Sequence, residues 1–79
     1  MRVKTKKLVV TFETAAAAMA LEQACAGRED WGRVIPTPQA LFAGCGLAWC
    51  APIEREAALL ALLKQRGIAY TATAFVELY

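Results

Sequence analysis

The chain has 79 residues, of which 58% are hydrophobic and 20% are charged. This length supports one small domain with a single core, and the hydrophobic content is too high for a disordered chain. Seventeen alanines contribute much of that content, and no apolar run approaches the ~18 residues that a membrane span requires. We therefore expect one soluble, cytoplasmic domain over residues 1–79.

The charge and the reactive side chains exclude several classes of function. The net charge is +2, and four of the nine basic residues lie in the first seven positions, so the remainder is near neutral and we expect neither a nucleic-acid nor a membrane partner. The absence of histidine excludes His-dependent acid–base catalysis and most zinc sites. Three cysteines without CxxC spacing do not form a disulfide scaffold. We expect no metal and no organic cofactor.

The first third of the chain predicts a strand followed by a helix. Residues 3–12 carry apolar side chains on both faces of an extended chain, which indicates a central strand. Thr14 is placed to cap an alanine-rich helix that runs to about Arg28. Residues 27–32 are then expected to turn. The apolar stripe of this helix consists of Ala17, Ala18, Leu21, Ala24 and Cys25.

The middle of the chain predicts two strands joined by a proline- and glycine-rich connection. A short strand over residues 33–35 is expected to end at Pro36 and Pro38, because proline cannot donate to a sheet ladder. Residues 39–43 are expected to form a single helical turn. The sequence Gly-Cys-Gly at 44–46 then leads into a third strand over residues 47–50.

The last third predicts a helix and a final strand. Pro52 suits the first position of a helix, and Gly67 is placed to end it in a Schellman motif, with Ile68 contacting Leu63. Residues 71–78 alternate in the manner of a strand. The predicted core consists of Leu8, Val10, Phe12, Leu21, Leu60 and Leu63.

The resulting order is β-α-β-β-α-β. With right-handed crossovers it predicts a ferredoxin-like α+β two-layer sandwich, a four-stranded antiparallel sheet with both helices on one face. The other sheet face would expose apolar groups such as Val9 and those of the last strand. Large exposed apolar patches mark interfaces, so we expect homo-oligomers formed through this open face.

Cys45 is the candidate reactive residue, because Gly44 and Gly46 flank it. Glycines remove side-chain obstruction and allow backbone N–H groups to converge on an anion such as a thiolate. The alternative is that both glycines serve a tight turn and Cys45 is only a small hydrophobic residue. An extended strand would hold Cys45 and Cys50 too far apart for a disulfide.

The remaining candidates are interpreted as structural. Cys50 and Cys25 are expected to be packed, and Glu54 and Glu56 to offset the dipole of a helix start. Trp31 and Trp49 fit either the core or an interface.

Two segments resemble a known family. Residues 32–38 read GRVIPTP and residues 44–49 read GCGLAW, which is similar to the signature of the "Putative Se/S carrier protein-like" family of small bacterial proteins. The resemblance extends to Thr11-Phe12, Glu22 and Gly67-Ile68. Gln39 replaces a residue that is often basic in the family, and Leu41-Phe42 replaces a more polar pair. A loop without that cation favours a persulfide over a tightly bound oxyanion.

The resemblance implies a carrier rather than an enzyme, with Cys45 matching the family's cysteine. Cys45 would hold sulfur or selenium as a persulfide or perselenide. Gly44, Gly46, Pro36, Thr37 and Pro38 would form the surrounding ligand site. Its partners would be donor and acceptor proteins for sulfur or selenium. Two alternatives remain: a regulatory or protein-interaction module with an unreactive cysteine, and a redox thiol that is glutathionylated or dimerises.

Overall fold

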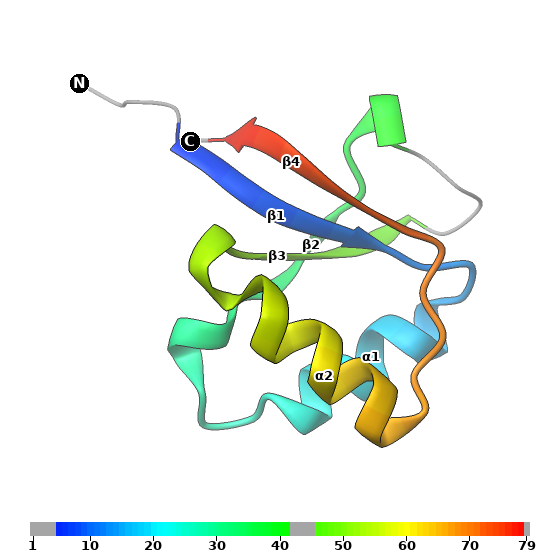
Figure 1. Cartoon of the computed structure of the whole chain (residues 1–79). Helices are drawn as coiled ribbons and strands as arrows, with labels where there is room; N and C mark the ends of the chain where they lie inside the picture. Colours follow the sequence, from blue (N-terminus) through cyan, green and yellow to red (C-terminus); the bar gives the residue numbers. More distant parts are fainter. Residues whose placement is uncertain (1–4, 42–45, 79) are drawn as a thin grey trace.

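A computed structural model describes residues 5–41 and 46–78 (Figure 1). The order of helices and strands is the predicted β-α-β-β-α-β. The elements are β1 (Thr5–Thr11), α1 (Ala15–Ala24), β2 (Arg33–Pro36), β3 (Leu47–Pro52), α2 (Glu56–Arg66) and β4 (Ala72–Leu78). Three short 3-10 turns lie between them, namely η1 (Glu29–Trp31), η2 (Gln39–Leu41) and η3 (Ile53–Arg55).

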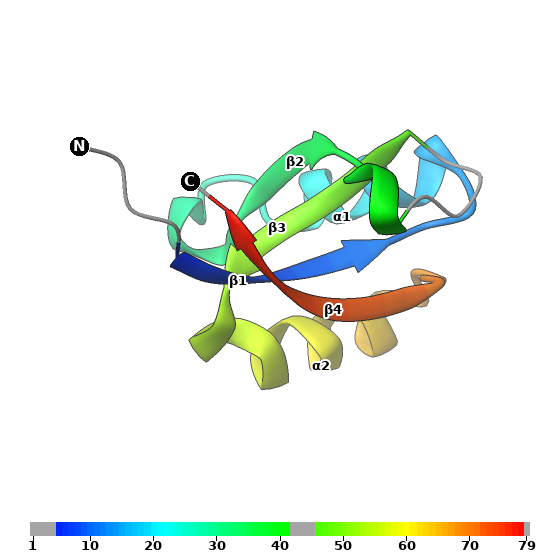
Figure 2. The ribbon, with the colours of Figure 1, turned by 90° about the horizontal axis from the view of Figure 1, so that it is seen from above.

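The four strands form one antiparallel sheet in the order β2-β3-β1-β4. β1 is central, as its two apolar faces predicted. Both helices lie on the same face of the sheet, α1 towards β2 and β3 and α2 towards β4 (Figures 1 and 2). This arrangement confirms the ferredoxin-like two-layer sandwich. None of the helices in the described parts of the chain is long and apolar enough to cross a membrane.

The core lies between the sheet and the two helices. Of the six residues predicted for it, five are buried and one, Leu60, is only half-buried. Leu60 packs against the edge of this core, because α2 begins at Glu56, after a separate 3-10 turn, and directs Leu59, Leu62 and Leu63 towards the sheet. These positions follow the i, i+3, i+4 spacing of one helix face.

Two helix boundaries differ from the sequence-based expectation. α1 ends at Ala24 rather than near Arg28, because the chain turns at Cys25 and Gly27 takes a left-handed φ of 80°. Pro52 ends β3 instead of opening α2, and η3 lies between them. The predicted Schellman motif is confirmed: Gly67 has φ 65°, and the Ile68 N–H donates to the Leu63 carbonyl at 2.9 Å.

The sheet face opposite the helices is less exposed than predicted. Val9 is fully buried between its strand partners Cys50 and Ala74, so the expectation that it contributes to an exposed apolar patch is wrong. Ala48 and Thr11 on the same face are also buried. η2 lies on this side of the sheet (Figures 1 and 2). The alternation of side chains along the strands did not reveal that these residues are buried.

Candidate functional site

Three chain connections meet at one end of the sheet. Antiparallel pairing brings Thr11, at the end of β1, beside Ala48 of β3 and Ala72 of β4. The β1–α1, β2–β3 and α2–β4 connections therefore leave the sheet at the same end (Figure 1). The Gly-Cys-Gly segment belongs to the β2–β3 connection, so this end of the sheet is the candidate site.

The β2–β3 connection is closed at its base by backbone contacts. Pro36 pairs with Leu47, and the Thr37 N–H donates to the Gly46 carbonyl at 2.9 Å. The Pro38 carbonyl accepts a 2.8 Å hydrogen bond from the Leu41 N–H, which forms the η2 turn. The structure thus brings together three of the predicted site residues, Pro36, Thr37 and Gly46, and places Pro38 one residue away.

Gly46 is exposed, and a Cβ placed on it would meet no atom within 4 Å. Its lack of a side chain is therefore not required by packing in the described structure. Gly44 and Cys45 lie outside the described residues. The residue that follows Cys45 is thus exposed and anchored through its carbonyl to Thr37.

The other two cysteines are packed, as predicted. Cys25, the C-cap residue of α1, is 5% exposed, and Cys50 on β3 is 8% exposed. Burial raises the pKa of both thiols; Arg28 opposes this effect at Cys25, and Lys7 and Arg33 oppose it at Cys50. A protonated, buried thiol is a poor nucleophile, so neither residue is suited to accept sulfur from another protein.

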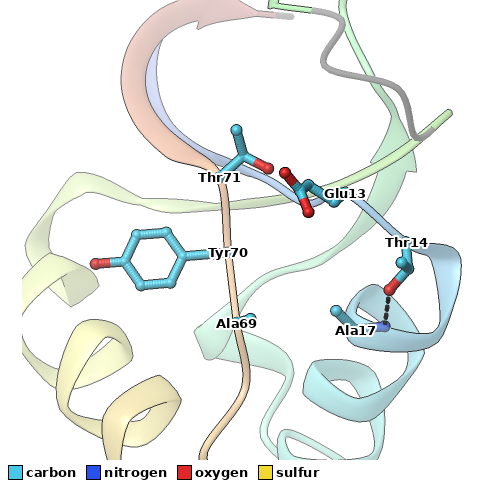
Figure 3. A pocket seen from close by; sticks show the side chains of 6 residues that line it. All are labelled: Glu13, Thr14, Ala17, Ala69, Tyr70 and Thr71. Carbon is cyan, nitrogen blue, oxygen red and sulfur yellow. Dashed lines mark hydrogen bonds between the residues drawn. The ribbon is translucent and has the colours of Figure 1, made fainter.

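A pocket of about 350 Å³ lies beside the same end of the sheet (Figure 3). Its lining comes from the β1–α1 connection, with Glu13 and Thr14, and from the α2–β4 connection, with Tyr70 and Thr71. The Thr71 side chain lies towards Glu13, whereas the Tyr70 ring points away from Glu13 and Thr14 (Figure 3). The Thr14 hydroxyl caps α1 by accepting from the Ala17 N–H at 3.2 Å. Sequence analysis gave Thr14 only this capping role and did not identify the pocket, because its two sides are distant in sequence and meet only through β1–β4 pairing.

A tryptophan contact holds the η1 turn, which precedes β2, against β3. The indole N–H of buried Trp49 donates to the Trp31 carbonyl at 2.9 Å. The guanidinium groups of Arg28 and Arg55 lie 5.0 and 5.7 Å from the centre of the Trp31 ring, and Arg55 also pairs with Asp30. Trp49 is therefore a core residue, and Trp31 attaches the η1 turn to β3.

Gly32, the first residue of the GRVIPTP segment, has a structural role between η1 and β2. Its φ is 112°, and a Cβ on it would lie 2.3 Å from the Cys50 carbonyl oxygen and 2.6 Å from the Trp49 indole nitrogen. The resemblance identified this residue, and the structure supplies the reason for glycine.

The acidic residues do not form a metal-binding cluster in the described structure. Glu54 lies in η3 and Glu56 in the first turn of α2, at the helix starts where they were predicted. Within residues 5–41 and 46–78, no group of three or more Cys, Asp or Glu side chains is arranged to hold a metal ion.

Comparison with known proteins identifies the family. The model of the "Putative Se/S carrier protein-like" family matches residues 7–74, a range that contains both resembling segments and Cys45. Searches of curated proteins and of solved structures gave no significant match. Because the family model covers most of the chain, the chain belongs to the putative Se/S carrier protein-like family.

Proposed function

We propose that this chain carries sulfur or selenium on Cys45, as a persulfide or perselenide, and transfers it to an acceptor protein. The observation that supports this proposal is the contrast among the three cysteines. Cys25 and Cys50 are buried with raised pKa values, whereas Cys45 is bonded to the exposed Gly46. Of the three, Cys45 alone lies in one of the two segments that resemble the family signature.

The proposed loading step is a thiol exchange. The Cys45 thiolate attacks the terminal sulfur of a persulfide on a donor protein. A new S–S bond forms on Cys45, the S–S bond of the donor breaks, and the donor cysteine leaves as a thiolate. Delivery repeats this exchange with the acceptor, so the cycle requires no external oxidant. For selenium, a donor perselenide passes its terminal selenium to Cys45 in the same way.

The surrounding residues support this chemistry by controlling access to the sulfur. The hydrogen bond from Thr37 to Gly46 and the pairing of Pro36 with Leu47 fix the base of the connection. Pro36 and Pro38 stiffen one side of it, since proline lowers the conformational freedom of the unfolded chain. Gly44 and Gly46 would leave the thiol unobstructed and provide N–H groups for a sulfur anion.

The proposal is tested by loading the protein with a cysteine desulfurase and cysteine, followed by peptide mass spectrometry under non-reducing conditions. We expect one added sulfur atom on the peptide that contains Cys45. Cys45→Ser should abolish the label, and the matched variants Cys25→Ala and Cys50→Ala should retain it. Repeating the loading with a perselenide donor tests selenium. A label spread evenly over all three cysteines would contradict the proposal, and no label would favour an interaction module with an unreactive cysteine.

A further inference from the structure

The two edge strands of the sheet, β4 and β2, differ in how well they are protected against pairing with a strand of another molecule. β4 forms one edge: all seven of its residues pair with β1, and no other strand in the described chain lies on its outer side. A free edge of this kind presents unpaired N–H and C=O groups that can accept another strand. β4 has the sequence ATAFVEL, without proline or lysine and with Glu77 as its single charge. It therefore lacks the usual protection against strand pairing.

β2, the other edge, is protected. It has only four residues, and its exposed Arg33 and Pro36 stand at its two ends. A charged side chain and a proline on a short edge strand disfavour the addition of another strand. Of the two edge strands, only β4 is thus long and regular enough for a strand of another molecule to pair along its full length.

We propose that β4 is an interface for a second copy of this chain, which pairs antiparallel with it and joins two sheets into one. A contact between identical edges is related by a two-fold axis and closes at two copies. Pairing of β4 with β2 of another copy would instead extend without closing, and the protected β2 edge opposes it. This interface lies at the opposite edge from the β2–β3 connection, so the dimer and sulfur carriage on Cys45 can be tested separately.

The residues of β4 suit this self-pairing. Phe75 is the central residue of Ala72–Leu78, so the register that pairs the full strand places the two copies of Phe75 opposite each other. Thr73 then faces Glu77 of the second copy, and Ala74 faces Val76. The pairs combine aromatic with aromatic, hydroxyl with carboxylate and apolar with apolar, each favourable across two strands. No like charges oppose each other.

An apolar surface beside Phe75 supports the same interface. Phe75 is 51% exposed although it lies on the helix-facing side of the sheet, opposite Leu8 of β1. It shares a groove of about 380 Å³ with Ile53, which is 39% exposed, and the charged side chains of Lys6, Glu54 and Glu56 also line this groove. The Phe75 ring of the second copy would enter the groove and remove this surface from water.

The length of β4 limits the surface that the two copies can bury, and a small contact is consistent with weak association. A seven-residue strand is ~23 Å long at ~3.3 Å per residue, so the contact is smaller than the roughly 800 Å² per partner of a standard stable interface. We therefore expect a reversible dimer with a micromolar dissociation constant rather than an obligate one.

Sedimentation equilibrium from low to high micromolar concentration tests the proposal. Wild type should change from monomer to dimer with increasing concentration. Phe75→Lys should raise the dissociation constant by at least about tenfold, because it places two like charges opposite each other. Met19→Lys is the matched control, since Met19 is similarly exposed, at 56%, but lies on α1. It should dimerise like wild type, and circular dichroism should show that both variants are folded.

Cysteine cross-linking tests the register. In a Cys45→Ser background, Phe75→Cys should form an intermolecular disulfide under mild oxidation, because opposed residues of paired strands lie ~4.5–5.5 Å apart between Cα atoms. Met19→Cys should not. Monomeric wild type at every concentration, dimerisation that Phe75→Lys leaves unchanged, or equal cross-linking of both cysteine variants would overturn the proposal.

Discussion

The substitution Gly32→Ala tests how the strand pair β2–β3 is held to the η1 turn. The new Cβ would lie 2.3 Å from the Cys50 carbonyl oxygen, 2.6 Å from the Trp49 indole nitrogen and 3.0 Å from the Ala51 Cα. Two of these neighbours are backbone atoms of β3, so the overlap cannot be relieved by rotating a flexible side chain. The start of β2 must move away from β3.

Two effects lower the free energy of unfolding of this variant, and their contributions add. A φ of 112° is unfavourable for any residue with a Cβ, at about 1–3 kcal/mol. Moving the segment also lengthens the hydrogen bond from Trp49 to the Trp31 carbonyl, and an unsatisfied buried donor costs about 1–3 kcal/mol. Together we expect a loss of roughly 4 kcal/mol, a large part of the 5–15 kcal/mol of a typical small domain. The Tm should fall by roughly 15–30 °C.

Urea unfolding followed by tryptophan fluorescence and circular dichroism measures this loss. Gly27→Ala is the matched control, because Gly27 also has a positive φ of 80° but no atom within 4 Å of the added Cβ. It should lose about 1 kcal/mol. Gly46→Ala, which meets open space, should change stability by less than about 0.5 kcal/mol. If Gly32→Ala lost no more stability than Gly27→Ala, the close approach to β3 would not be the reason for glycine.

Three further outcomes are expected. Leu59→Ala should destabilise the protein by about 2–5 kcal/mol in urea unfolding and Leu60→Ala by clearly less, since Leu59 is fully buried and Leu60 is not; equal losses would contradict this account of α2. Thr14→Ala should cost about 1 kcal/mol through loss of the α1 cap, and Thr14→Ser should restore most of it. Because burial raises the pKa values of Cys25 and Cys50, the unfolded state ionises first as pH rises past about 9, and the free energy of unfolding should decrease there. Replacing both Cys25 and Cys50 with Ala should flatten this pH dependence of the free energy of unfolding. If the dependence were unchanged, the two buried thiols would not be its cause.

The candidate site shows what could be predicted from residues alone. Cys45 and its flanking glycines are adjacent in sequence, so their pattern was recognisable without a fold. Pro36 and Thr37 were recognised through the family resemblance, and the structure adds that they face Leu47 and Gly46. The pocket between Glu13 and Tyr70 was not predictable, because its two sides come from opposite ends of the chain and no local pattern relates them.

Local interactions and periodicity allowed the sequence to determine the order of elements, the central place of β1 and the Schellman ending at Gly67. Each depends on residues within a few positions of one another, where backbone propensity and side-chain alternation act directly. The tertiary structure alone decided which leucines of α2 are buried, what Trp49 contacts, and that Val9 is covered on the face opposite the helices. These outcomes depend on how distant segments pack. Leu59 and Leu60 lie ~100° apart around the helix axis, so the orientation of α2 against the sheet decides which of them is buried. Val9 is buried where β3 and β4 flank β1.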